Sequence, residues 1–240
     1  MKKVAFFVEG PTEADFVKRY LKEITSQKGL VITYEGFGGK QTPRLFQQTY
    51  TDGLAGRDYQ INIYISHADN RVNSDFLDNL QSLDKSGFSL VIALKDLRGD
   101  KPDGTSKTLA DLPRIENLEQ LIFAKANPSV KSILAVMEIE TWFIAETSHF
   151  QRIHSSLTQE LIVSNSATLG VNPFVDNLTQ IAKPAETLDE IYKLKKRRYD
   201  KGKKRRQRTI NALDYANLYL NVPLRLAKFD EFAKTVDSIF

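Results

Sequence analysis

The amino-acid sequence predicts an α/β fold in which helices cover a parallel or mixed sheet and a helical region follows. Short, predominantly apolar runs such as residues 4–8 and 88–94 are typical of strands that are buried on both faces of a sheet. Segments with helical periodicity lie between these runs, and strands that alternate with helices favour parallel pairing. Beyond Trp142 the strand pattern ends, and the sequence is almost entirely helical.

The first strand leads directly into the first helix. Residues 4–8 are apolar, and Gly10 and Pro11 interrupt the run abruptly. We expect Thr12 to cap the following helix, with Asp15 three residues later as in a capping box. This order predicts a tight turn at the carboxyl end of the strand, where open α/β sheets bind their ligands.

The remaining elements follow the same alternation up to Met137. Further strands are expected at residues 30–37, 61–65, 88–94 and 130–137. Helices are expected at residues 42–50, 71–86 and 112–126, and in the C-terminal part at residues 156–163, 187–196, 203–220 and 224–239. We therefore divide the chain into an α/β domain, residues 1–146, and a helical region, residues 147–240.

The composition is that of a globular protein, but the charge is unevenly placed. The 240 residues carry a net charge of +4, yet residues 193–208 contain eleven basic residues and one acid. The rest of the chain is therefore acidic, and a concentrated basic segment indicates binding to phosphate or nucleic acid. The chain has no cysteine and no apolar run long enough to cross a membrane, so we expect a cytoplasmic protein with no membrane partner.

The basic segment offers candidate contacts to nucleic-acid phosphates. Tyr192 and Tyr199 lie among the basic residues and are expected to offer faces on which bases stack. Lys201 follows closely, and we expect it to reach the phosphate that is cleaved. The other candidates, in this segment and outside it, are Lys40, Arg98, Lys195, Lys196, Arg197, Arg198, Lys203, Lys204, Arg205 and Arg206. A solvated helix or hinge is the alternative interpretation of such a charge run.

Acidic side chains follow three of the predicted strands. They are Glu9 with Glu13 after the first strand, Asp96 with Asp100 and Asp103 after residues 88–94, and Glu138 with Glu140 and Glu146 after the last strand. Because parallel strands end at the same edge of a sheet, we expect these acids to meet there. Carboxylate oxygens are the ligands of hard cations such as Mg²⁺, and two such ions would support hydrolysis of a phosphodiester.

Ordinary structural roles are the alternative for several of these acids. Glu13, in a first helical turn, favours the helix dipole without any ligand, and Asp100 and Asp103 lie in a turn-rich segment. Glu138 and Glu140 open a helix whose apolar face is suited to core packing. We retain as metal ligands Glu9, Glu13, Asp96 and Asp100, and as catalytic residues Glu9, Glu138 and Lys201.

Four segments carry a resemblance to known families. They are Val8–Glu13, Leu94–Asp96, Ala135–Glu146 and Tyr199–Lys201, and together with the final helices they span most of the chain. Their order resembles the Toprim fold of topoisomerases, primases and overcoming-lysogenization-defect nucleases, and more closely the bacterial domain-of-unknown-function family numbered 4276. The resemblance implies a Toprim-like sheet, a magnesium or manganese site, and nuclease activity in a phage-defence or mobile-element setting. By the same match, Glu9 would bind metal or act as general acid/base, and Glu13 and Asp96 would help to hold the metal ions.

One position departs from the Toprim pattern. The resemblance implies an Asp-x-Asp element, but here Asp96 and Leu97 are followed by Arg98. If Asp100 does not replace the second aspartate, one metal ion is held weakly or not at all. Arg98 would then contact a substrate phosphate or solvent.

Taken together, the motifs favour a divalent-metal-dependent nuclease that acts on DNA or RNA with Mg²⁺ or Mn²⁺. The alternative is a catalytically weak component that binds nucleic acid or a protein partner. A third class is an enzyme that handles small molecules containing phosphate. The motifs do not distinguish DNA from RNA, single from double strands, or one oligomeric state from another.

Overall fold

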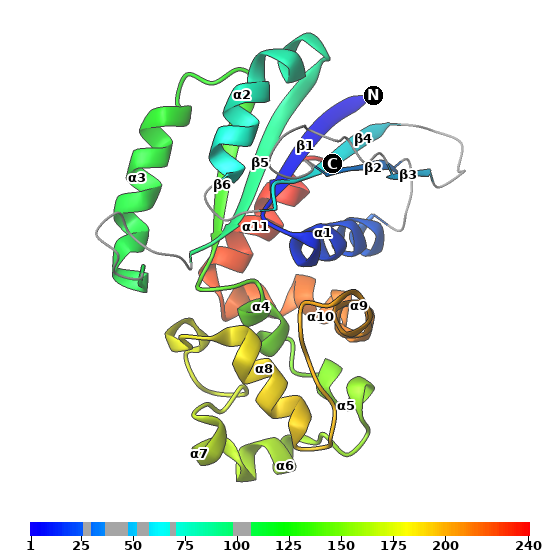
Figure 1. Ribbon diagram of the computed structural model, residues 1–240, viewed down its shortest axis with the longest axis vertical. Helices are drawn as coiled ribbons and strands as arrows, with labels where there is room; N and C mark the ends of the chain where they lie inside the picture. The colour runs from blue at the N-terminus through cyan, green and yellow to red at the C-terminus, as the bar shows by residue number, and fades with distance from the viewer. Residues whose placement is uncertain (26–29, 37–47, 52–57, 68–70, 98–106) are drawn as a thin grey trace.

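A six-stranded sheet forms the centre of the protein. The computed structural model describes residues 1–25, 30–36, 48–51, 58–67, 71–97 and 107–240 (Figure 1). The strands are β1 (Lys2–Val8), β2 (Leu30–Gly36), β3 (Gln48–Thr51), β4 (Tyr59–Ile65), β5 (Phe88–Asp96) and β6 (Ser129–Ala135), in the order β3-β2-β4-β1-β5-β6. All neighbouring pairs are parallel except β2 and β3, which confirms the expected α/β architecture with a mixed sheet.

One predicted helix is wrong in its C-terminal part. Residues 48–51 form β3, although the sequence predicted a helix over residues 42–50. The two threonines and the tyrosine of this segment favour a strand, and pairing with β2 satisfies the backbone groups on one side of this edge strand. Residues 42–47 lie outside the described part of the chain.

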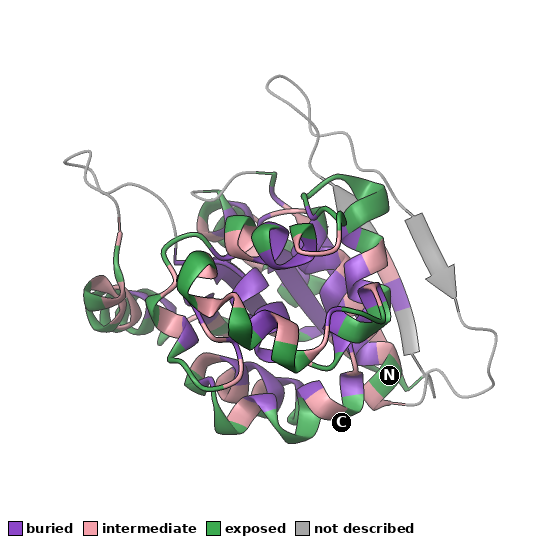
Figure 2. Ribbon diagram, turned by 90° about the horizontal axis from the view of Figure 1, so that it is seen from below, coloured by how far each residue is buried: buried purple, intermediate pink, exposed green. Residues whose placement is uncertain are grey.

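The strands bury alternate residues on the two faces of the sheet. In β1, Val4, Phe6 and Val8 pack into one hydrophobic cluster, whereas Ala5 and Phe7 pack into another. This alternation follows from the two-residue period of a strand. Figure 2 shows the buried residues concentrated in the interior, enclosed by helices with exposed outer faces. Both faces of the sheet are therefore covered, as parallel strands require.

Helices from distant parts of the chain cover these two faces. Those that alternate with the strands are α1 (Pro11–Ile24), α2 (Val72–Lys85) and α3 (Leu112–Phe123), with the short 3-10 helix η1 (Leu109–Asp111) before α3. On one face α2 meets α3, where the ring centroids of Phe76 and Phe123 lie 5.0 Å apart. On the other face α1 meets the last helix, α11 (Ala227–Asp237), where the rings of Tyr20 and Phe232 lie 5.1 Å apart. The C-terminus of the chain thus returns to the sheet (Figure 1).

The remaining helices lie beyond the carboxyl ends of the parallel strands (Figure 1). They are α4 (Glu140–Ala145), α5 (His149–Ile153), α6 (Gln159–Ser164), α7 (Ser166–Leu169), α8 (Pro184–Lys193), α9 (Lys203–Ala212) and α10 (Tyr215–Leu220), with the 3-10 helices η2 (Leu178–Gln180) and η3 (Val222–Leu224). One hydrophobic cluster continues from β1 into these helices and includes Phe143, Leu188 and Leu218. Among the described residues, no helix combines the length and apolarity needed to cross a membrane.

The start of α1 differs from the predicted cap. Gly10, and not Thr12, is the N-cap, and the helix begins at Pro11. Glu13 occupies the position expected for Asp15, because its Oε2 accepts the backbone N–H of Gly10 at 2.9 Å. The cap therefore fixes the side chain of Glu13 beside the end of β1.

The helix predicted over residues 203–220 is broken into α9 and α10. Asp214 caps α10, since its Oδ1 accepts the N–H of Asn217 at 3.1 Å. The N–H of Asp214 itself bonds to the buried carboxylate of Glu146 at 3.0 Å. A side-chain cap and a tertiary hydrogen bond thus decide where α9 ends, which helical periodicity alone does not reveal.

Candidate functional site

The carboxyl ends of β1 and β5 bring the first group of acids together. These strands are direct parallel neighbours, with Val8 opposite Leu94. Glu9 follows β1, and its Oε1 accepts the backbone N–H of Asp96 at 2.9 Å. Glu13, in the first turn of α1, is buried at the same edge and adds to the negative field at Asp96. The parallel topology thus gathers acids that lie far apart in the sequence.

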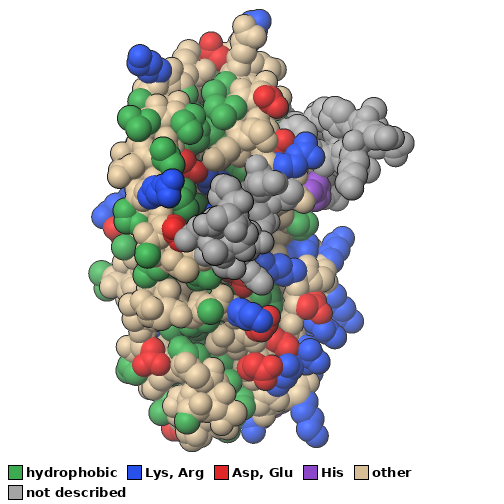
Figure 3. Space-filling view, turned by 60° about the vertical axis from the view of Figure 1, so that its left-hand side comes forward, with side chains coloured by type: hydrophobic (Ala, Val, Ile, Leu, Met, Phe, Trp, Pro, Cys, Tyr) green, Lys and Arg blue, Asp and Glu red, His purple; other side chains and the backbone are tan. Residues whose placement is uncertain are grey.

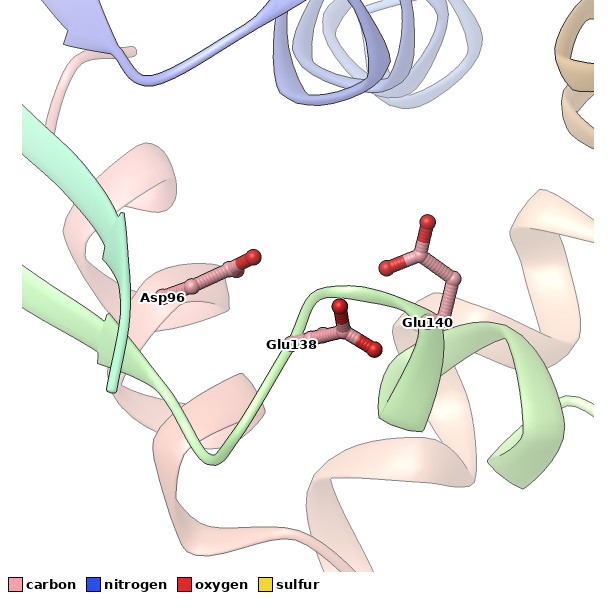
Figure 4. A group of neighbouring side chains, drawn as sticks. All are labelled: Asp96, Glu138 and Glu140. Carbon is pink, nitrogen blue, oxygen red and sulfur yellow. The ribbon is translucent and has the colours of Figure 1, made fainter. Parts of the chain in front are cut away.

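The turn after β6 adds two more carboxylates. Met137 adopts a left-handed φ of 61°, and the chain then enters α4 through Glu138 and Glu140. One oxygen from each of Asp96, Glu138 and Glu140 lies within 4.8 Å of the others, and all three residues are buried. Figure 4 shows them converging from the end of β5 and the start of α4. We call these three residues the acidic triad.

Each carboxylate of the acidic triad has one oxygen anchored by a protein donor. Asp96 Oδ1 accepts a backbone N–H immediately before α4 at 3.0 Å. Glu138 Oε2 accepts a backbone N–H in the first turn of α8 at 2.9 Å. Glu140 Oε1 accepts the hydroxyl of Tyr199 at 2.6 Å. The carboxylates are therefore held in place by elements on three sides.

The other oxygen of each carboxylate faces Lys201. Its Nζ lies 3.4 Å from Glu138 Oε1, 3.7 Å from Glu140 Oε2 and 3.9 Å from Asp96 Oδ2. Of these three contacts, the one with Glu138 is a hydrogen bond. Among the described residues, Glu140 Oε2 has no hydrogen-bond donor, although Glu140 is 0% exposed. The three oxygens thus surround one position suited to a cation.

Burial and mutual repulsion shift the titration of these groups. Burial, followed by the charges of Glu13 and Glu9, raises the pKa of Asp96 well above its usual range. Burial also raises the pKa of Glu140 to about 7, against the opposing effect of Lys201. Burial alone lowers the pKa of Lys201, but the surrounding carboxylates outweigh burial and raise it. The site therefore favours additional positive charge, such as that of a divalent cation.

Comparison with known families places the chain in one of them. The model of a family described as a domain of unknown function (DUF4276) matches residues 8–217. The chain belongs to this family. No curated protein and no solved structure matches it. The matched residues of this DUF4276 protein include the acidic triad, Glu9, Glu13 and Lys201.

Two arginines of the basic segment have structural partners. Arg206 is buried, and it donates to Asp15 Oδ2 and to the backbone carbonyl of Lys201, both at 2.8 Å. Arg198 Nε lies 3.0 and 3.2 Å from the two carboxylate oxygens of Asp189. These contacts hold the loop between α8 and α9 in place over the acidic triad. Arg206 therefore does not lie on the exposed basic face that the sequence suggested.

Other members of the segment do face solvent. Figure 3 shows Lys and Arg side chains gathered at the lower right of the molecule, the half that holds α8 and α9 in Figure 1. Lys195 is half-buried, and Arg205 is exposed but paired with Asp200. Four residues of this segment are exposed and have no acidic partner named above: Lys196, Arg197, Lys203 and Lys204. We call these four residues the basic surface.

The expectation that Tyr192 and Tyr199 stack on bases is wrong. Their exposed fractions are 0% and 3%, and their rings contact each other with centroids 6.3 Å apart. The hydroxyl of Tyr192 bonds to Thr209 at 3.2 Å, and that of Tyr199 bonds to Glu140. These tyrosines therefore belong to the core beneath the basic segment, and Tyr199 positions a carboxylate of the acidic triad.

The structure adds Glu140 to the predicted metal ligands. Several other predicted site residues lie outside its described part. The sequence prediction of metal ligands does not include Glu140, and its position two residues after Glu138 is the signal that could have indicated it. Glu146, at the other end of α4, does not belong to the acidic triad. The candidates that lie outside the described residues are Lys40, Arg98, Asp100 and Asp103.

Proposed function

We propose that this protein is a divalent-metal-dependent nuclease that hydrolyses phosphodiester bonds in DNA or RNA, with Mg²⁺ or Mn²⁺ as its cofactor. The observation that carries the proposal is the acidic triad, in which each buried carboxylate has one anchored oxygen and turns the other toward a shared position. An all-oxygen donor set suits a hard divalent cation. Glu140 Oε2 fits this role because a buried oxygen without a donor is unusual in a purely structural carboxylate.

The residues around the acidic triad suggest a division of roles. Asp96, Glu138 and Glu140 would hold the ion, and Glu13 would add negative charge beside them. A bound Mg²⁺ or Mn²⁺ supplies charge stabilisation for the reacting phosphodiester. Glu9, fixed to the N–H of Asp96, is our candidate for the general acid/base. Lys201, with 47% of its side chain exposed, is our candidate for contacting the substrate phosphate.

The basic surface supports a polynucleotide substrate. Its four exposed residues flank the loop that carries Lys201, so basic side chains continue from the acidic triad onto the surface. Contacts of Lys and Arg with phosphates supply most of the sequence-independent affinity for nucleic acids. Replacing Lys203 and Lys204 with alanine should therefore weaken binding and make it less dependent on salt.

We also propose that the fold is Toprim-like, which is a finer relationship than membership of the DUF4276 family. β1 and β5 are neighbours in the sheet, and Glu9 after β1 accepts the N–H of Asp96 at the end of β5, which supports a Toprim-like arrangement. The phage-defence or mobile-element setting follows only from that resemblance. The cytoplasmic location rests on the absence of cysteine, and the division at residue 146 rests on the change from strands to helices.

Cleavage assays test the proposal directly. Plasmid DNA, duplex and single-stranded oligonucleotides and structured RNA would be incubated with Mg²⁺, Mn²⁺ or EDTA. We expect metal-dependent cleavage by the native protein and none by Asp96→Asn or Glu140→Gln. Glu160→Gln, at an exposed site, is the matched control and should cleave normally. Full activity in both triad variants, or no cleavage of any polynucleotide by the native protein, would reject the proposal.

A catalytically weak binding protein is the second candidate. Lys201 already lies among the three carboxylates, so the site has an internal cation without any metal. Such a protein would bind nucleic acid or a protein partner without turnover. Salt-sensitive binding combined with no uptake of Mn²⁺ in calorimetry would favour it over the nuclease.

A further inference from the structure

A side chain of the protein already occupies the cation position of the acidic triad. Lys201 Nζ lies between 3.4 and 3.9 Å from one oxygen of each carboxylate. Divalent cations bind carboxylate oxygens at about 2.0–2.6 Å, so an ion on the same oxygens would lie very close to this ammonium group. Two cations at such a distance in a buried site repel each other strongly. Lys201 and a divalent ion therefore compete for the acidic triad.

The backbone that carries Lys201 is fixed. Arg206 donates to the carbonyl of Lys201 at 2.8 Å, and the N–H of Tyr199 donates to Asp189 at 2.7 Å. By contrast, the Lys201 side chain is 47% exposed and has four rotatable bonds. Its ammonium group can leave the triad for solvent while the loop and the carboxylates keep their positions.

Glu140 gives an independent reason for a divalent ion to replace the ammonium group of Lys201. Its Oε2 is buried and lies 3.7 Å from Lys201 Nζ, which is too far for a hydrogen bond. The lysine therefore offsets part of the negative charge of the acidic triad without satisfying all three oxygens. A small divalent ion is able to contact all of them at once.

We propose that Lys201 gates metal binding. In the metal-free protein its ammonium group is the internal cation of the acidic triad, and a divalent ion displaces this group outward. Lys201 is two residues before Lys203 of the basic surface. Its displaced ammonium group is therefore available to a phosphate oxygen bound there. Metal and phosphate then favour each other's binding, because each selects the outward position of Lys201. This inference rests on the proposed function in taking a phosphate-containing substrate.

Mn²⁺ titration by calorimetry tests the competition. Lys201→Met should bind Mn²⁺ about tenfold more tightly than the native protein, as expected if Lys201 is outward about a tenth of the time. Lys125→Met removes an exposed lysine that belongs neither to the acidic triad nor to the basic surface, and it should bind Mn²⁺ as the native protein does. Equal or weaker affinity in Lys201→Met would overturn the proposal.

Thermal unfolding in EDTA adds a readout that requires no metal. Lys201→Met should melt at a lower temperature than Lys125→Met, and adding Glu140→Gln should recover part of the loss. Equal melting temperatures for the two lysine variants would contradict the resident role of Lys201. If Lys201→Met does not fold, Lys201→Arg keeps the charge and should bind Mn²⁺ no more tightly than the native protein; tighter binding would overturn the proposal.

The outcomes separate this inference from the nuclease proposal. If Lys201→Met binds Mn²⁺ more tightly but no polynucleotide is cleaved, the gating inference stands and the proposed function falls. If cleavage depends on metal but both proteins have the same affinity, only the gating inference falls. If neither protein binds Mn²⁺, both fall.

Discussion

Two glutamates at opposite ends of α4 are equally buried, yet their surroundings differ. Glu140 and Glu146 are both 0% exposed. Glu146 Oε1 accepts from the side chain of Asn217 at 2.6 Å, and its Oε2 accepts the N–H of Asp214 at 3.0 Å. Glu140 has one oxygen bonded to Tyr199, and the other has no donor among the described residues. One carboxylate holds the fold together, and the other has capacity for a ligand.

The difference teaches that burial of a carboxylate does not by itself indicate function. A buried oxygen that is fully hydrogen-bonded has already been stabilised by the fold. A buried oxygen that lacks a donor, and that faces other carboxylates, retains its demand for positive charge. Hydrogen-bond saturation therefore separates the structural glutamate from the candidate metal ligand.

The largest expected effect is on folding at Glu146. Glu146→Gln should lower the free energy of unfolding by about 3 kcal/mol, because the new amide must turn an N–H toward existing donors. Urea unfolding in EDTA measures this loss. The same substitution at Glu140 is the matched control and should change metal-free stability by less than about 1 kcal/mol. Equal losses at the two positions would remove the distinction between them.

The next effect concerns metal affinity, which should depend on Glu140 and not on residues outside the acidic triad. Glu140→Gln should weaken Mn²⁺ binding by about 100-fold, which corresponds to about 2.7 kcal/mol, because it removes one charged ligand. Calorimetry checks this value. Glu160→Gln removes an exposed carboxylate outside the acidic triad and should leave Mn²⁺ affinity unchanged. A similar loss in that variant would show that the effect is indirect.

A pH dependence should come from the surroundings of Glu146. His149 packs there, and burial lowers its pKa from 6.5, although the neighbouring Glu146 opposes the shift and Arg152 adds to it. The unfolded chain thus binds this proton more readily, so stability is lost as the pH falls below about 6.5. Between about pH 7.5 and 5.5, the native protein should lose about 1 kcal/mol more than His149→Phe in urea unfolding. An identical loss in both proteins would exclude His149 as the cause.

The smallest effect is expected at the exposed cation near Glu146. Arg152 pairs with Asp214, and the side chains of both are partly exposed, at 48% and 30%. Arg152→Ala should cost no more than about 1 kcal/mol, since exposed ion pairs contribute little. Thermal unfolding at low and high salt measures this contribution. A much larger cost would mean that Arg152 stabilises this region more than an ordinary exposed ion pair does.

Much of the fold and part of the candidate site could be predicted from the amino-acid sequence. The apolar runs predicted β1 and β5, and the parallel topology explains why Glu9 and Asp96 meet at one edge. The helix predicted at residues 42–50 is wrong at residues 48–50, where threonine and tyrosine favour a strand and pairing with β2 forms one. The sequence prediction of metal ligands does not include Glu140, because the helix that it opens has an apolar face suited to core packing.

The sequence by itself determined the alternation of strands and helices, the acids at the strand ends, and the concentration of basic residues at 193–208. Only the tertiary structure decided which of these side chains are saturated with partners. Arg206 is bound to Asp15, and Tyr199 is bound to Glu140, across long separations in the chain. The physical reason is that periodicity reports which face of an element is buried, whereas hydrogen-bond satisfaction depends on donors that folding brings from elsewhere.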